Sequence, residues 1–209
     1  SFVLMRKMNS KQIAEKYDLI AKWYDFCVSI IEVLGMIGLR KKLIGKARGK
    51  VLEIGIGTGR NLRYYNKECE IIGIDYSEEM LKIAKKRADK SKMNVKLIKM
   101  DAEKLNFRKV KFDSVVDTLG LCTYSNPIKV LKEMKRVVKK NGKILLLEHG
   151  ESNNKFIRKL QGFSRESHYE KSGCNLLRNH EELVRKAGLK IVKIERKFFG
   201  IFYLIEART

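Results

Sequence analysis

The sequence predicts an α/β fold with a doubly wound, seven-stranded sheet and helices on both faces. Seven short apolar runs punctuate the chain, and several are apolar on both faces of a strand, as a parallel sheet covered by helices requires. Segments with helical periodicity alternate with these runs. The chain of 209 residues contains a single proline, Pro127, so proline-rich linkers between domains are absent. The runs are Val51–Ile54, Glu70–Ile74, Val95–Ile98, Phe112–Val116, Ile144–Leu147, Ile191–Ile194 and Phe202–Ile205.

Residues 1–49 precede the first strand and are predicted to form a helical cap. Their middle, Phe26 to Leu39, is apolar except for Ser29, Glu32 and glycines, and basic residues follow it. One interpretation is a helix that covers the sheet edge or the site. The other is an interfacial helix that dips into a membrane; fourteen residues are too few for a span of about 20.

Three helices are predicted after the first strand. Ser77–Lys90 begins with a cap residue followed by two glutamates, which suit a helix N-terminus. Pro127–Lys140 places its apolar residues on one face, and Glu181–Ala187 ends at a glycine. The strands over 191–197 and 201–207 are joined by only three residues, so we expect them to pair antiparallel. The sheet is therefore mostly parallel, with an antiparallel last strand.

The formal net charge is +22, and its distribution matters for the partner. The excess is +7, +4, +5 and +6 over residues 1–50, 51–100, 101–150 and 151–209, so no basic tail or arm is present. Lysines distributed evenly along a chain are typical of a solvated surface. They also attract phosphate-rich partners, either RNA or an anionic membrane.

The four cysteines, Cys27, Cys69, Cys122 and Cys174, are far apart in the sequence. They form no CxxC pair and no Cys/His cluster along the chain, so we predict no metal site. Cys122 and Cys174 are interpreted as small buried side chains rather than nucleophiles. A disulfide framework is not expected in a chain with a full core, which favours a reducing, cytoplasmic compartment.

The segment from Val51 to Arg60, VLEIGIGTGR, predicts a strand, a glycine turn and a helix start. Glycines permit positive φ and close approach of the backbone to a ligand. A dinucleotide fingerprint requires glycine where Arg60 stands, and no Gly-Lys-Ser/Thr of a phosphate-binding loop follows. An acid, Glu53, instead precedes three alternating glycines: Gly55, Gly57 and Gly59.

This pattern resembles the first motif of class I S-adenosylmethionine (SAM) methyltransferases, which have a Rossmann-like fold. Asp75 ends the second strand, 20 residues after Gly55, where a carboxylate can bind both ribose hydroxyls. Asp101 and Ala102 follow the third strand, where this family reads the adenine. The segment Leu131 to Lys143 is similar to the family's helix–turn–strand signature, with Asn141 where proline is common. The resemblance covers residues 45–150, and it implies SAM as cofactor, with further contacts from Tyr17, Tyr24, Asn61, Tyr76, Met80 and Thr118. Glu53 is also placed in this set, with a bracing role in the turn as its alternative.

The N-terminal segment resembles a narrower group. Lys16 to Asp25, KYDLIAKWYD, is similar to the YDxxAxxYD entry helix of quinone (UbiE-type) and phospholipid N-methyltransferases, where this helix closes over the cofactor. Asp117 to Cys122, DTLGLC, and the later Leu147-Glu148-His149 resemble bacterial phosphatidylethanolamine N-methyltransferases and the methyltransferase-like 7 thiol methyltransferases. Candidate proton acceptors are Asp117, His149 and Tyr24, with a satisfied polar residue at a strand end as the alternative for His149.

The chain is expected to form one domain with four parts. Residues 1–49 are the helical cap, 50–149 the SAM-binding core, 150–177 an insert, and 178–209 the last helix and two closing strands. In the insert, Phe156, Ile157, Leu160 and Phe163 recur at helical spacing. The insert is interpreted as an acceptor lid, a membrane-contacting face or a packed helix.

The favoured function is SAM-dependent methyl transfer to a small-molecule or lipid-headgroup acceptor, an amine, thiol or quinone, by in-line displacement. The alternatives are an RNA methyltransferase that uses the basic surface, and a SAM-binding protein without transfer activity. Nucleic acid is disfavoured because no Pro-Pro loop follows the fourth strand and no RNA-binding module is appended. Peripheral contact with an anionic membrane is the second expected interaction, and no oligomeric state is predicted.

Overall fold

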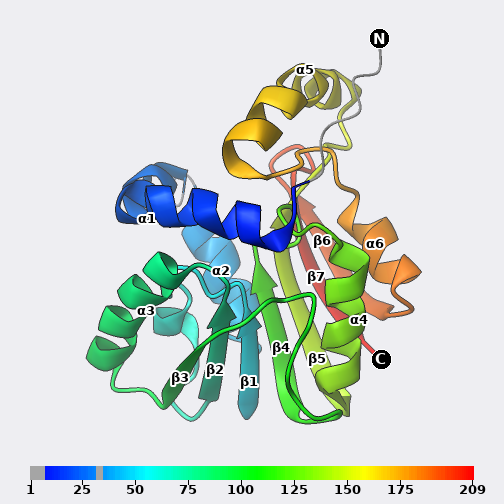
Figure 1. The fold of residues 1–209 in the computed structure, drawn as a ribbon. Coiled ribbons are helices and arrows are strands. Elements are labelled where there is room, and N and C mark those ends of the chain that lie inside the picture. The colour runs from blue at the N-terminus through cyan, green and yellow to red at the C-terminus, as the bar shows by residue number, and fades with distance from the viewer. Residues whose placement is uncertain (1–7, 32–34) are drawn as a thin grey trace.

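The computed structural model describes residues 8–31 and 35–209; residues 1–7 and 32–34, the latter within the apolar stretch 26–39, lie outside the described residues. A seven-stranded sheet forms the centre, with strand order β3-β2-β1-β4-β5-β7-β6 (Figure 1). The strands are β1 (Lys50–Ile54), β2 (Glu70–Asp75), β3 (Val95–Lys99), β4 (Phe112–Thr118), β5 (Val138–His149), β6 (Lys190–Lys197) and β7 (Phe202–Arg208). The helices are α1 (Ser10–Ile31), α2 (Ile37–Ile44), α3 (Glu78–Ser91), α4 (Pro127–Val137), α5 (Lys155–Ser172) and α6 (His180–Lys186).

The strand directions confirm the predicted topology. Strands β1 to β5 pair in parallel, and β7 runs antiparallel to both β5 and β6. The strand order reverses between β1 and β4, which lie side by side although they are not consecutive. In open α/β sheets, ligands bind beyond the carboxyl ends of the strands at such a switch point.

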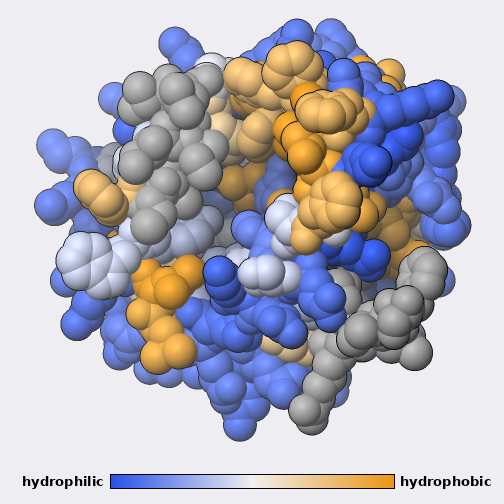
Figure 2. Space-filling view, turned by 90° about the horizontal axis from the view of Figure 1, so that it is seen from above, coloured by the Kyte–Doolittle hydropathy of each residue, from blue (hydrophilic) through white to orange (hydrophobic). Residues whose placement is uncertain are grey.

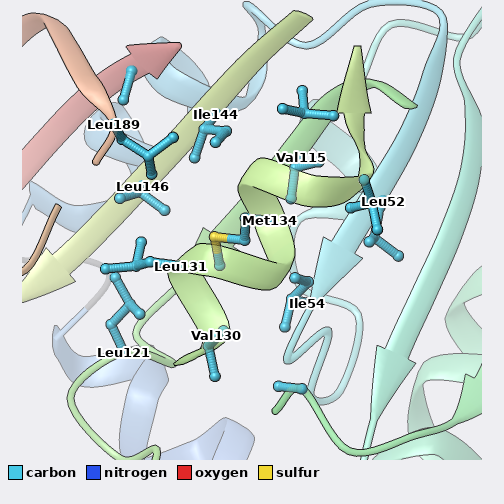
Figure 3. Close-up of a cluster of buried hydrophobic side chains, with 14 of the residues drawn as sticks. Leu52, Ile54, Val115, Leu121, Val130, Leu131, Met134, Ile144, Leu146 and Leu189 are labelled. Carbon is cyan, nitrogen blue, oxygen red and sulfur yellow. The ribbon is translucent and has the colours of Figure 1, made fainter. Parts of the chain in front are cut away.

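Helices cover both faces of the sheet. On one face, the buried side of α4 packs on β1, β4 and β5 (Figure 3). Val130, Leu131, Met134 and Val137 recur at helical spacing along that side, and each is fully buried. On the other face, α2 and Ala88 of α3 pack over the outward side chains of the same strands. Each face thus buries an apolar layer, which is the main stabilising term of such a fold.

Several predicted boundaries differ from the structure, and the fifth strand, predicted over Ile144–Leu147, spans Val138–His149. The helix predicted over 127–140 ends at Val137, because Val138 takes extended dihedrals and pairs with Phe112 of β4. The helix start predicted after Gly59 is a single 3-10 turn, η2 (Leu62–Tyr64). The segment before β2 is short, and the side chains of Asn61 and Tyr65 turn inward to bind Glu53.

Helices α1 and α5 lie at the carboxyl-terminal edge of the sheet, above the strand ends (Figure 1). The two helices meet where the amide of Met8, just before α1, donates to the Tyr169 hydroxyl of α5 (3.1 Å). Within the two ranges that the structure describes, no helix has the length and apolar character needed to cross a bilayer.

Candidate active site

A cleft lies beyond the carboxyl ends of β1, β2 and β4, beneath α1. It encloses about 760 Å³ of space, counting the solvent at its mouth. Ten residues predicted from the sequence to bind cofactor line this cleft: Tyr17, Tyr24, Gly55, Gly57, Asp75, Tyr76, Met80, Asp101, Ala102 and Thr118. The fold thus brings together residues from five separate segments of the chain.

The glycine loop after β1 forms the floor of the cleft. Gly55 has φ +62°, and a Cβ atom there would lie 2.7 Å from the hydroxyl oxygen of Tyr124. Gly57 and Gly59 also have positive φ, which L side chains rarely adopt. Glycine is therefore required at Gly55 for two reasons, backbone conformation and space.

Asp75 connects the glycine loop to the start of α3. Its carboxylate accepts hydrogen bonds from the backbone N–H of Gly57 (2.8 Å) and of Ser77 (2.9 Å). A carboxylate offers about four acceptor positions, so two remain for the vicinal hydroxyls of a ribose. Burial raises the pKa of Asp75, and the backbone donors oppose that rise. The geometry fits a nucleoside whose ribose is held by Asp75.

Three predicted cofactor residues lie behind the loop rather than along the cleft. Glu53 is buried and accepts from Asn61 Nδ2 (2.7 Å) and from the Tyr65 hydroxyl (2.9 Å). Burial raises the pKa of Glu53 to about 7, although these hydrogen bonds oppose the rise. Asn61 also binds the buried Arg40, whose guanidinium donates to Asn61 Oδ1 (2.7 Å). Gly59 packs against Ala84 of α3. In the structure, Glu53 and Asn61 therefore brace the loop from below.

Two aspartates fix α1 over the cleft. Asp18 accepts from the Ser77 hydroxyl (2.5 Å) and the Glu79 amide (3.1 Å), at the N-terminus of α3. Asp25 accepts from the Thr58 hydroxyl (2.8 Å) and pairs with Arg87 (2.5 Å) and Arg60 (3.0 Å). The KYDLIAKWYD motif is thus explained by structure: its aspartates anchor the helix on the glycine loop and on α3.

The two tyrosines of the same motif face the cleft. The rings of Tyr17 and Tyr24 meet edge to face, with centroids 6.0 Å apart. Burial raises the pKa of Tyr24 to about 12 and that of Tyr17 well above its usual value. Both phenols therefore stay protonated at neutral pH and present hydroxyl groups to a ligand.

Asp117, at the end of β4, lies beside a second buried carboxyl group. The amide of Gly120 donates to Asp117 Oδ1 (3.0 Å) and to Glu148 Oε1 (3.2 Å). Burial raises the pKa of Asp117 to about 7 and raises that of Glu148 well above its usual value, and the neighbouring Asp117 charge adds to the rise at Glu148. Asp117 does not line the cleft itself; Tyr124, whose hydroxyl lies beside it next to Gly120, does.

His149 lies at the end of β5, outside the cleft lining. Its Nε2 atom is 3.2 Å from Cys174 Sγ, and Cys122 lies beside both. No Cys/His cluster is present along the chain, but Cys122, His149 and Cys174, which are distant in sequence, are adjacent in space. Sequence reasoning also missed Arg40, Glu148 and Tyr124 as neighbours of the site, because nothing local marks them as buried.

Comparison with known proteins agrees with this geometry. Residues 52–146 match the family model described as "Methyltransferase domain". Over 194 residues, the chain is 34% identical to an uncharacterised protein of Methanocaldococcus jannaschii, covering 89% of this chain and 83% of that protein. It is 36% identical over 103 residues to a phosphatidylethanolamine N-methyltransferase of Cereibacter sphaeroides, covering 48% of this chain and 51% of that protein.

A solved structure has the same fold. It is the SAM-dependent methyltransferase of Thermotoga maritima described as a possible histamine N-methyltransferase, with a TM-score of 0.71 and 24% identity, over 93% of this chain and 98% of that chain. The chain spans about half the length of the first two curated relatives that it matches, 45% and 51%.

The glycine loop, the Asp75 carboxylate at the end of β2 and the match to the methyltransferase domain agree on one cofactor, S-adenosylmethionine. The chain belongs to the class I SAM-dependent methyltransferases.

Proposed function

We propose that the chain transfers the methyl group of SAM to an acceptor presented at a membrane surface, a phospholipid amine headgroup first among them. The observation that carries this proposal is a set of exposed apolar side chains at the edge of the sheet where the cleft opens. SAM supplies the activated methyl group, so the protein has to bind the acceptor in line, exclude water and accept a proton.

The exposed apolar side chains follow helical spacing on two helices. On α5, Phe156, Leu160 and Phe163 are 70%, 51% and 77% exposed. On α1, the series is Leu19, Trp23 and Phe26, exposed by 83%, 71% and 69%. The turn between β6 and β7 adds Phe198 and Phe199. We call these eight residues the apolar rim.

The position of the apolar rim supports contact with lipid. Figure 2, which looks down on this edge of the molecule, shows apolar groups separated by hydrophilic residues. Soluble proteins rarely leave several large side chains exposed together on one face without a binding role. Lys155, Arg158 and Lys159 of α5 are also exposed, and basic side chains on an amphipathic helix suit an anionic lipid surface. This arrangement supports a membrane-contacting α5 over a packed one.

The proton acceptor is proposed to be Asp117, acting through Tyr124. An ammonium headgroup must lose a proton before it can attack the methyl carbon. Tyr124 lines the cleft, and its hydroxyl lies beside the Asp117 carboxylate, next to Gly120. Because the pKa of Asp117 is raised to about 7, this carboxylate is a stronger base than an ordinary aspartate at neutral pH.

The test supplies labelled SAM with three acceptor pools: anionic vesicles that contain phosphatidylethanolamine, small thiols, and total RNA. We expect label in the vesicle lipid. The variants Phe156→Asp and Phe163→Asp should lose vesicle methylation and the blue shift of Trp23 emission on vesicles, while SAM binding is retained. Val110→Asp is the matched control, since Val110 is 52% exposed and lies before β4 at the opposite edge of the sheet.

Three outcomes would contradict the proposal. Label confined to RNA would favour the basic surface as a nucleic-acid site. Label confined to small thiols, unaffected by the α5 variants, would exclude a membrane acceptor. No label in any pool, with SAM still bound, would indicate a SAM-binding protein without transfer activity.

A further inference from the structure

Three metal-ligand side chains converge at the edge of the molecule next to the cleft. Cys122 lies in the loop after β4, His149 ends β5, and Cys174 follows the glycine that terminates α5. Their ligand atoms, two sulfurs and one ring nitrogen, all lie within 4.8 Å of one another, and Cys174 Sγ is 3.2 Å from His149 Nε2. Both cysteines are buried and reduced, and the histidine is partly buried.

Hydrogen bonds to backbone carbonyls hold these segments together independently of the three side chains. The amide of Asn175, next to Cys174, donates to the carbonyl of Cys122 (2.9 Å). The guanidinium of Arg178 donates to the carbonyls of Leu121 and Tyr124 (2.7 Å for Tyr124). Cys174 is set by the left-handed Gly173 before it, with φ +72°. The donor atoms are therefore preorganised, which lowers the entropic cost of binding an ion.

The spacing fits a tetrahedral ion with sulfur and nitrogen ligands. Zinc binds cysteine sulfur at about 2.3 Å and histidine nitrogen at about 2.0–2.1 Å, so adjacent ligand atoms of a tetrahedron lie roughly 3.5–3.8 Å apart. Cys174 Sγ lies 3.2 Å from His149 Nε2, slightly below that range. No pair of the three ligand atoms is more than 4.8 Å apart, slightly above it.

Charge also favours a divalent cation at this position. Two thiolates and one neutral imidazole carry two negative charges, which a divalent ion neutralises, so the ion and its three protein ligands would together hold no net charge. Soft thiolate ligands with imidazole select zinc over magnesium or calcium. Two cysteines with a histidine favour zinc over magnesium or calcium, whereas a single cysteine beside a histidine would not.

We propose that Cys122, His149 and Cys174 bind a zinc-class divalent ion, with its fourth position filled by water or an exogenous ligand. The ion would link the loop after β4, the end of β5 and the turn after α5, and so fix the base of α5 beside the cleft. Leu119 and Gly120, which line the cleft, lie in the same loop as Cys122. When the ion is bound, His149 Nε2 is a ligand and is unavailable as a general base. The site does not depend on which acceptor is methylated.

The test measures bound metal in the full chain after purification with a thiol reductant and dialysis against zinc-free buffer. We expect about one zinc per chain in the wild type, and background levels in Cys122→Ser, Cys174→Ser and His149→Ala. Cys69→Ser is the matched control and should keep its zinc, because Cys69 is also a buried free cysteine but lies elsewhere, where its sulfur donates to the carbonyl of Ala47 (3.7 Å).

Cobalt titration of the wild-type chain keeps the proposal testable if a ligand variant fails to fold. Tetrahedral binding should give a thiolate-to-cobalt charge-transfer band and intense visible bands, and both should vanish on addition of one equivalent of zinc. Two results would overturn the proposal: no zinc and no such bands in the reduced wild-type chain, or an intact mass that shows a Cys122–Cys174 disulfide in protein purified without oxidant.

Discussion

Replacing Asp75 by asparagine tests the cofactor site most directly. The Asp75 carboxylate accepts the Gly57 amide at 2.8 Å and the Ser77 amide at 2.9 Å. Asparagine keeps one acceptor oxygen and directs an NH₂ group at the second donor. One backbone N–H is then left without an acceptor, which lowers the free energy of unfolding by about 1–3 kcal/mol.

The loss of SAM affinity is expected to be larger than the loss of folding stability, and the two can be measured separately. At least one ribose hydroxyl loses a hydrogen bond to a charged acceptor, worth about 1.5–3 kcal/mol. Because about 1.4 kcal/mol corresponds to a tenfold change in Kd, the affinity for SAM should fall by about 10- to 150-fold. Isothermal titration calorimetry with SAM and with S-adenosylhomocysteine measures this change, and circular dichroism verifies that the variant is folded.

Asp113→Asn is the matched control for this experiment. Asp113 lies near the start of β4, at the opposite edge of the sheet, where it accepts from the Lys50 amide (2.9 Å) and pairs with Lys139 (2.6 Å). Its substitution should leave the Kd for SAM unchanged. A folded Asp75→Asn variant that binds SAM within a factor of about two of the wild type would refute the assignment of Asp75 to the ribose.

Three further predictions concern the loop, the residue beneath it and the helix above it. Gly55→Ala should abolish SAM binding, because its Cβ would meet the Tyr124 hydroxyl at 2.7 Å; calorimetry should show partial recovery in the Gly55→Ala/Tyr124→Phe double variant. Burial holds the pKa of Glu53 at about 7, above its ordinary 4.5, so the folded state binds more protons than the unfolded state between these values. Stability should therefore fall by about 3 kcal/mol as pH rises through this window, and urea unfolding across it should show a smaller fall for Glu53→Gln. Burial opposes ionisation of Asp25, but hydrogen bonds from Arg87, Thr58 and Arg60 lower its pKa. The stabilisation from Asp25 is thus present above its ordinary pKa and lost on acidification, and Asp25→Asn should speed hydrogen exchange in α1 at neutral pH.

Local patterns in the sequence were sufficient to predict the strands and the cofactor loop. The apolar run from Val51 to Ile54 and the glycines after it are contiguous, and Asp75 follows the next run at a fixed strand end. The position of Val137 as the last residue of α4 was not predictable, since the helical periodicity continues into Val138 and only pairing with Phe112 ends the helix.

Convergence in space accounts for most of what the sequence could not predict. Cys122, His149 and Cys174 are brought together by the parallel order of β4 and β5 and by the return of the chain after α5. In the sequence, Arg40 belongs to a basic cluster that follows an apolar stretch. In the structure, its side chain is only 4% exposed and donates hydrogen bonds to Asn61 and Thr118. Residues of this kind are identified by tertiary contacts, because no local signal separates a buried arginine from a solvated one.

The direction of β7 has a practical consequence for measurements at membranes. Because β7 runs against β5, Phe202 pairs with His149 near the cleft, while Ala207 pairs with Ile144, toward the far edge of the sheet. Thr209 therefore leaves the domain on the side away from the apolar rim (Figure 1). A label or surface tether attached after Thr209 would orient every molecule with its cleft toward the solution, so that vesicles flowed over such a layer meet the apolar rim first.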